Sequence, residues 1–393
     1  MKKNIVLLSL FISFLACAQP NSYMLTLSEQ LRDSGICTGE NYQALLKAVE
    51  QKEIHSEFDI IRYFNNVVIL NAADFTTASV ETFERLHRKT AAAHPDLSFT
   101  DFEVQYKKEL ADNPFQIPMD YALVSLQHKG KKYQLQNTIY LEPNNEVGRE
   151  MVLDEYYQIF NKILANEQSP YQLHRLDKNQ KGWDDPEQFA IVAFTEEQAN
   201  MLQGTMLFSM SAEFLRPIYS SKQIEAVLDG FKKSGVLEGL SPKELILAKE
   251  KIERQAIGSD EEILTCFPNL IYCFDVELGN IDTPYEELIQ AFSRISRGAF
   301  YPLDLNCRFE MGSEQGAFIE FNFNTKHYQI TLDASSDYLD SRFIEFMNFV
   351  AKDNSLPGRF YQKSDPYSQE LCILYLTETQ ASQLGEQLHI KLK

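Results

Sequence analysis

Long hydrophobic runs and positive charge are both scarce in this chain. After residue 18 no apolar run approaches the roughly 18 to 20 residues that a membrane-spanning helix needs, so we expect no span in the body of the protein. Only 37 Lys and Arg oppose 56 Asp and Glu, which gives a formal net charge of −19. Nucleic acid is bound largely by neutralising its phosphates with Lys and Arg. We therefore expect no nucleic-acid partner.

Signature motifs of several enzyme classes are also missing. The sequence has no G-x-S-x-G nucleophile elbow, no G-x-x-x-x-G-K-[ST] phosphate loop and no G-x-G-x-x-G dinucleotide turn. Its seven histidines never fall in H-E-x-x-H or another close metal-binding spacing. His87 and His94, on either side of a predicted helix end, are expected to be exposed or helix-ending residues. The sequence thus predicts no catalytic residue, no metal and no cofactor.

The N-terminus predicts export. Two lysines precede an apolar run at residues 5–16, as in a signal peptide covering residues 1–18. Two processing sites overlap there: Phe14-Leu-Ala-Cys17 resembles a bacterial lipobox, whereas Ala16-Cys-Ala18 resembles a site for ordinary signal peptidase. We expect a periplasmic, outer-membrane or cell-surface lipoprotein with its lipid on Cys17, and simple secretion is the alternative. Membrane contact would then be made only through that lipid.

The body of the chain is duplicated. The clearest match pairs Ala190-Ile-Val-Ala-Phe-Thr-Glu-Glu-Gln-Ala199 with Cys372-Ile-Leu-Tyr-Leu-Thr-Glu-Thr-Gln-Ala381. Four earlier anchors occur in the same order: Ser34-Gly35-Ile36 with Ser234-Gly235-Val236, Phe64-Asn-Asn-Val-Val68 with Phe267-Pro-Asn-Leu-Ile271, Tyr133-Gln-Leu135 with Tyr328-Gln-Ile330, and Phe160-Asn-Lys-Ile-Leu-Ala165 with Phe346-Met-Asn-Phe-Val-Ala351. We predict two tandem repeats, residues 22–215 and residues 220–393.

The pattern within each repeat predicts an α+β fold. Two amphipathic helices flank a Ser-Gly turn, and a strand, a helix, further strands, a helix, two strands and a closing helix follow. In the second repeat a β-hairpin is expected over residues 317–332, with its turn at Asn324-Thr325. Because strict βαβ alternation is absent, each repeat should be a mostly antiparallel sheet packed with helices on one face.

The cysteines outside the signal are expected to be buried and free. The alignment of the repeats pairs them with apolar residues: Cys372 with Ala190, Cys273 with Leu70, and Cys37 with Leu237. Positions that accept Cys, Ala or Leu are typical of a core, where a free Cys behaves as a small hydrophobe. One disulfide that involves Cys266 or Cys273 is the alternative, since an exported protein can be oxidised.

Two groups of polar residues are explained by helix starts. Thr195-Glu-Glu-Gln198 and Thr377-Glu-Thr-Gln380 each have the Thr and Gln spacing of a capping box. Asp333, Asp337 and Asp340 form an acidic loop before a helix, but they lack the dense ligand spacing of a calcium-binding loop. We expect capping roles for both groups.

The strongest candidate for a binding surface is a loop of the first repeat. Gly182-Trp183-Asp184-Asp185-Pro186 holds the single Trp of the chain, in a connection longer than its counterpart in the second repeat. A Trp in such a loop either folds back to bury its ring or anchors a partner. We predict binding by Trp183, Asp184 and Asp185, together with Phe115 of another long connection.

These features together predict a protein- or peptide-binding module of the cell envelope. Loops on a rigid scaffold commonly serve recognition, and an acidic surface suits a basic partner. The alternative is an envelope hydrolase whose acidic residues converge in a cleft between the repeats.

Overall fold

The computed structural model describes residues 20–108, 120–141, 149–177, 188–204, 217–279, 281–312, 316–364, 369–388 and 390–393. These residues divide into two compact units. The first unit contains the residues up to Lys107 and Tyr121–Ile218, and the second contains Tyr219–Lys393. Among the described residues, no helix combines the length and apolarity needed to cross a membrane.

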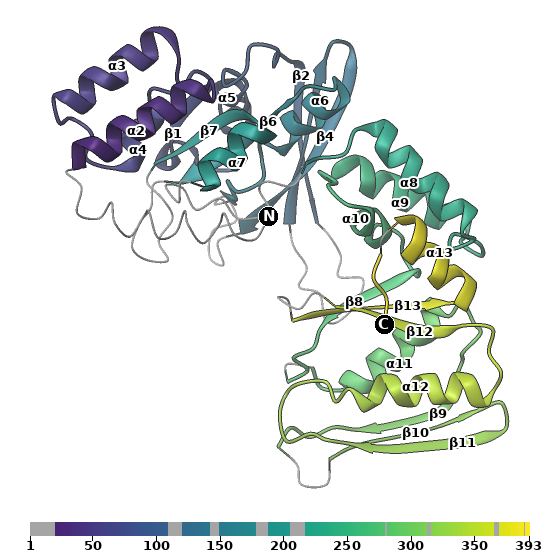
Figure 1. The fold of residues 1–393 in the computed structure, drawn as a ribbon. Helices are drawn as coiled ribbons and strands as arrows, with labels where there is room; N and C mark the ends of the chain where they lie inside the picture. The colour runs from purple at the N-terminus through teal and green to yellow at the C-terminus, as the bar shows by residue number, and fades with distance from the viewer. Residues whose placement is uncertain are drawn as a thin grey trace. The chain divides into compact units, whose positions relative to one another are not determined.

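The two units contain the same elements in the same order (Figure 1). The first unit consists of α2 (Pro20–Asp33), α3 (Gly39–Glu50), α4 (Glu57–Ile61), β1 (Val67–Asn71), the 3-10 helix η1 (Ala72–Phe75), α5 (Val80–Ala91), β2 (Thr100–Lys108), β3 (Asp120–His128), β4 (Lys131–Leu141), β5 (Arg149–Met151), α6 (Gln158–Asn166), β6 (Tyr171–Asp177), β7 (Gln188–Thr195) and α7 (Glu196–Gly204). The second unit consists of α8 (Ser221–Lys233), α9 (Pro242–Arg254), α10 (Asp260–Thr265), β8 (Ile271–Asp275), α11 (Pro284–Ile295), β9 (Leu303–Arg308), β10 (Ala317–Phe323), β11 (Lys326–Leu332), α12 (Arg342–Asp353), β12 (Arg359–Ser364), β13 (Glu370–Leu376) and α13 (Glu378–Leu388). Only η1 and β5 have no counterpart among the described residues of the second unit, so the duplication is visible in the fold.

Each unit contains two small antiparallel sheets. The strand orders are β1-β7-β6 and β2-β3-β4-β5 in the first unit, and β12-β13-β8 and β11-β10-β9 in the second. The predicted α+β class and antiparallel pairing are confirmed. The strands of each unit form two sheets, because the hairpin pairs with the strand directly before it, whereas the first strand of the unit forms a sheet with the last two strands of the unit. The hairpin turn itself is confirmed, with φ of 47° at Asn324 and 66° at Thr325.

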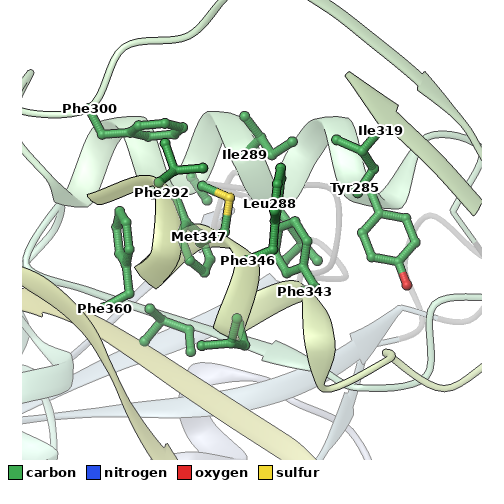
Figure 2. Close-up of a cluster of buried hydrophobic side chains, with 14 of the residues drawn as sticks. Tyr285, Leu288, Ile289, Phe292, Phe300, Ile319, Phe343, Phe346, Met347 and Phe360 are labelled. Carbon is green, nitrogen blue, oxygen red and sulfur yellow. The ribbon is translucent and has the colours of Figure 1, made fainter. Parts of the chain in front are cut away.

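The second unit is built in four layers (Figure 1). Helices α8, α9, α10 and α13 pack on one face of the β12-β13-β8 sheet, and α11 and α12 lie between that sheet and β9-β10-β11. Two cores lie on either side of the β12-β13-β8 sheet: the first lies under α8, α9, α10 and α13, and the second surrounds α11 and α12. Strand β13 is apolar on both faces, since Leu374 points into the first core and Ile373 into the second. Figure 2 shows part of the second core, where the rings of Phe292 and Phe360 lie 4.5 Å apart.

Both predicted capping boxes are confirmed, and each has a further role. The backbone N–H of Thr195 donates to Oε1 of Gln198 at 3.0 Å, and the N–H of Gln198 donates to Oγ1 of Thr195 at 3.3 Å. Nε2 of Gln198 also donates to the carbonyl of Ser34 at 3.0 Å, and Nε2 of Gln380 donates to that of Gly235 at 2.8 Å. The closing helix of each unit is thus tied to the turn after its first helix.

Losing the capping hydrogen bond of Thr195 should lower the stability less than losing the hydrogen bonds of Gln198. Thr195→Ala is expected to lower the free energy of unfolding by about 1 kcal/mol, because one capping bond is lost. Gln198→Ala removes its reciprocal bond and the bond to Ser34, so we expect about 2 kcal/mol. Urea denaturation of both variants measures the difference. Equal costs would show that the bond to Ser34 contributes nothing.

A second hydrogen-bonding pattern, in which a helix Asn binds both backbone groups of a strand residue, occurs in both units and corrects the alignment of the repeats. Nδ2 of Asn161 donates to the carbonyl of Leu173 at 3.0 Å, and its Oδ1 accepts the N–H of Leu173 at 2.6 Å. Asn348 makes the same two bonds to Phe360, both at 2.8 Å. The sequence alignment placed Phe160 opposite Phe346, which is one residue out of register, because the structure makes Asn161 and Asn348 equivalent.

His87 is a core residue, which corrects the expectation that it is exposed or helix-ending. It is fully buried within α5, where its Nδ1 bonds to the carbonyl of Phe83 at 2.7 Å. Its ring lies 5.2 Å from that of Phe102 and 5.5 Å from that of Tyr156. Burial lowers the pKa of His87 to about 4, so the imidazole is neutral in the native protein at neutral pH.

Candidate functional site

The residues chosen from the sequence as a binding surface lie outside the part of the chain that the structure describes. This applies to Trp183, Asp184 and Asp185, to Phe115, and to the expected lipid attachment site Cys17. Their roles remain predictions.

The acidic loop before α12 has the structural role expected of it. Asp340 accepts the backbone N–H of Asp333 at 2.8 Å and that of Arg342 at 3.0 Å. The Arg342 guanidinium lowers the pKa of Asp340 to about 2. The predicted capping role is confirmed for Asp340, whose carboxylate stabilises the loop and the start of α12.

A disulfide in the second unit overturns the expectation of free cysteines for two residues. Cys273 on β8 and Cys372 on β13 are direct partners across the antiparallel pair, and their sulfurs are bonded. Cys37 and Cys266 are buried and free, as expected. The alternative of one bridge involving Cys273 therefore holds, with Cys372 as its partner.

A shift of one residue in the alignment explains why this bridge was missed. The alignment put Cys273 opposite the core residue Leu70. In the structure Ile69 pairs with Ala190, and Cys273 pairs with Cys372, the counterpart of Ala190, so Ile69 is the counterpart of Cys273. Successive side chains of a strand point to opposite faces, so a slip of one residue places the side chain on the wrong face.

The disulfide belongs to a line of three side chains across the sheet, which we call the cysteine row. Lys363 on β12 pairs with Cys372 on β13, and Cys372 pairs with Cys273 on β8. Directly paired residues point to the same face of a sheet. The equivalent residues of the first unit are all apolar: Leu176, Ala190 and Ile69.

A fourth position, beside the cysteine row, is also apolar in the first unit and polar in the second. Helices α4 and α10 both begin after a capping Ser, and their second residues are Phe58 and Glu261. Phe58 is buried in the core of the first unit, whereas Oε2 of Glu261 lies 2.9 Å from Nζ of Lys363. One scaffold therefore carries an apolar cluster in the first unit and a disulfide beside an ion pair in the second.

The two cysteines of the disulfide differ in exposure. Cys372 is only 3% exposed, whereas Cys273 is partly exposed and lies on β8, an edge strand. Oε2 of Glu370 lies 3.7 Å from Sγ of Cys372. Cys273, Glu370 and Cys372 are the only set of three or more His, Cys, Asp or Glu among the described residues whose potential metal-ligand atoms all lie within 4.8 Å of one another. The two sulfurs of this group are bonded to each other.

The second unit also has an open sheet surface, which we call the outer face. It is the side of β9-β10-β11 directed away from α11 and α12 (Figure 1). Its side chains form three cross-strand rows: Arg308, Phe318 and Thr331; Asn306, Glu320 and Gln329; and Leu303, Asn322 and His327. Nδ2 of Asn322 donates to Oδ2 of Asp304 at 2.9 Å, and Leu303 is 57% exposed. The outer face thus combines hydrogen-bonding groups with exposed apolar surface.

Comparison with family models, with curated proteins and with solved structures finds no match. The assignment of a site therefore depends on the residues of this chain alone.

Proposed function

We propose that this protein is an exported component of the cell envelope that binds a protein or peptide partner. The signal-like N-terminus supports export, and a lipid on Cys17 would anchor the chain. The disulfide between Cys273 and Cys372 supports the same location, because disulfides persist mainly in oxidising compartments.

The outer face is the observation that carries the binding role. Its side chains are held in register by three strands, so little order has to be gained when a partner binds. Leu303 and His327 are both exposed and lie in one row with Asn322. The net charge of −19 favours a basic partner, which electrostatic attraction would bring to the protein. The loop with Trp183 is the proposed second contact.

The carboxyl groups give the hydrolase alternative no support within the described residues. A general acid in a glycosidase has a raised pKa. Every described Asp or Glu with a shifted pKa has it lowered, mostly through hydrogen bonds that stabilise the carboxylate: Asp59, Glu167, Glu244, Asp333, Asp340 and Asp353. A lowered pKa favours the charged carboxylate of each group, whereas a general acid has to carry a proton.

Affinity capture tests the proposed binding. Residues 19–393, used as bait for envelope and secreted fractions, should retain a partner whose purified form binds directly. A Leu303→Ser and His327→Ala double variant, or Trp183→Ala, should weaken this binding at least about tenfold, because truncating an anchor costs about 1.4 kcal/mol or more. Ile246→Ser is the matched control, since Ile246 is an exposed apolar residue on α9 in another layer.

The control variant should bind as the unchanged protein does. Unchanged affinity in both surface variants would show that neither the outer face nor the Trp183 loop is the binding surface. Failure to retain any direct partner from either fraction would contradict the proposed function itself.

A further inference from the structure

We infer that the bond between Cys273 and Cys372 is a thiol–disulfide exchange site whose co-reactant is an external dithiol. This chemistry goes beyond partner binding and does not depend on the outer face. The inference stands on the position of the cysteine row in its sheet, on the different exposure of Cys273 and Cys372, and on the contrast between the two units.

The sheet leaves only one side open for attack. A thiolate attacks a disulfide sulfur from the side opposite the bond that breaks. β8 is an edge strand, so the line from Cys372 to Cys273 continues past the edge of the sheet. In the other direction the line meets Lys363 on β12, and Cys372 is buried. Cys273 is therefore the sulfur attacked, and Cys372 is the leaving sulfur.

The exchange balances with a dithiol as the reductant. The first thiolate of the dithiol forms a bond to Sγ of Cys273, the bond between the two protein sulfurs breaks, and Sγ of Cys372 leaves with the electron pair. The second thiolate of the dithiol then attacks the first sulfur of the same dithiol, which is bonded to Cys273 in the mixed disulfide, and Cys273 leaves as a thiolate. The dithiol is oxidised to a disulfide, and the two protons that it loses end on the two cysteines.

Two charged neighbours act on the leaving sulfur in opposite directions. A thiol of lower pKa leaves faster, and a nearby cation lowers the pKa of a thiol. Lys363 is the direct cross-strand partner of Cys372, and its Nζ is also ion-paired with Glu261 at 2.9 Å; we propose that the remaining positive field favours departure of the sulfur as a thiolate. The Glu370 carboxylate, 3.7 Å from Sγ of Cys372, opposes it.

The first unit shows that this scaffold does not need the bridge. Its row of Leu176, Ala190 and Ile69 holds the same three strands in the same register without a covalent link. Phe58 lies in one core cluster with Leu176 and Ala190, at the position where the second unit has Glu261, and Ile69 on the edge strand is 39% exposed. The same sheet thus forms in the first unit without a covalent link, which favours a disulfide that can open without unfolding the second unit.

The direct test follows the disulfide of the folded protein, residues 19–393, with dithiothreitol as the probe. Free thiols are first blocked with iodoacetamide, and the cysteines released by dithiothreitol are then labelled and mapped by mass spectrometry, with circular dichroism as the control for folding. We expect Cys273 and Cys372 to be released while the native spectrum is retained. Release only under unfolding conditions would overturn the inference.

Single-cysteine variants test the direction of attack. Cys372→Ser leaves the thiol of Cys273 on the edge strand, and Cys273→Ser leaves that of Cys372 in the sheet. Towards a small aromatic disulfide, the first variant should react at least about tenfold faster at the remaining thiol, because access limits the buried sulfur. Equal rates, or a faster Cys372, would overturn the assignment of Cys273. Buried Cys37 serves as the internal reference for an inaccessible thiol.

Charge variants give a readout that a purely structural bridge would not move. Lys363→Met should slow reduction by dithiothreitol several-fold, and Glu370→Gln should accelerate it. Glu370→Gln keeps the size of an exposed side chain, and Met keeps most of the aliphatic part of Lys363. Circular dichroism checks that both variants are folded. The same rate in both variants would overturn the role of Cys372 as the leaving sulfur.

Discussion

Asn161→Leu is expected to lower the free energy of unfolding by about 3 kcal/mol. The side chain is 2% exposed and satisfies both backbone groups of Leu173, which lies on β6. Leu has a similar size but no hydrogen-bonding group, so a buried N–H and a buried carbonyl would lose their partner. Each such group costs about 1 to 3 kcal/mol. Chemical denaturation followed by circular dichroism measures the loss.

The second unit offers a matched pair for this experiment. Asn348→Leu removes the same two bonds from Phe360 and should also be strongly destabilising. Asn200→Leu, at an exposed position on α7, is the control and should stay within about 0.5 kcal/mol of the unchanged protein. A cost below about 1 kcal/mol for Asn161→Leu would show that the backbone of Leu173 finds other partners.

His87→Phe is expected to remove a large part of the loss of stability in acid. The native pKa of His87 is about 4 because of burial, and the ordinary value is 6.5. Between these two values the unfolded chain binds a proton that the native protein does not, so the free energy of unfolding falls as the pH falls from 6.5 towards 4. The full difference corresponds to about 3 kcal/mol, at about 1.4 kcal/mol for each pH unit.

The second unit suggests Phe as the replacement. Its Phe292 lies 5.5 Å from Phe343, as His87 lies 5.5 Å from Tyr156 at the equivalent position of the first unit. The stability difference between His87→Phe and the unchanged protein should therefore shift in favour of the variant by about 3 kcal/mol between pH 7 and pH 4. Urea denaturation at both pH values measures it. A difference that does not change with pH would mean that His87 titrates normally in the native protein.

The sequence predicts best those features whose signal is local. The capping boxes at Thr195 and Thr377 and the hairpin turn at Asn324 depend on residues a few positions apart, and the structure has them as predicted. The order of elements in the two repeats is visible for the same reason, since hydrophobic periodicity is local too.

Register between distant segments was harder to predict. An alignment of apolar residues tolerates a slip of one position, because Ile69 and Leu70 are both apolar and either can be placed opposite Cys273. A sheet does not tolerate it, since one residue reverses the face. The same slip in α6 hid the equivalence of Asn161 and Asn348, although both are Asn and both precede a strand.

The candidate redox site could not be assembled from the sequence for a related reason. Glu261, Cys273, Lys363 and Cys372 come from one helix and three strands, and nothing in their spacing brings them together. The pairing of the repeats could have exposed them, had the register been right, as four positions where polar or sulfur-containing residues replace Phe58, Ile69, Leu176 and Ala190. Only the register of the sheets makes that comparison possible.

The glutamine ties have a consequence for how such a chain could arise. Because Gln198 and Gln380 fasten the last helix of each unit to the turn after its first helix, the beginning and the end of a unit are neighbours in space. A module with adjacent ends can be copied and inserted in tandem with a short connection, without threading the new copy through the old one. The duplicate then keeps its own closure, and its surface is free to diverge.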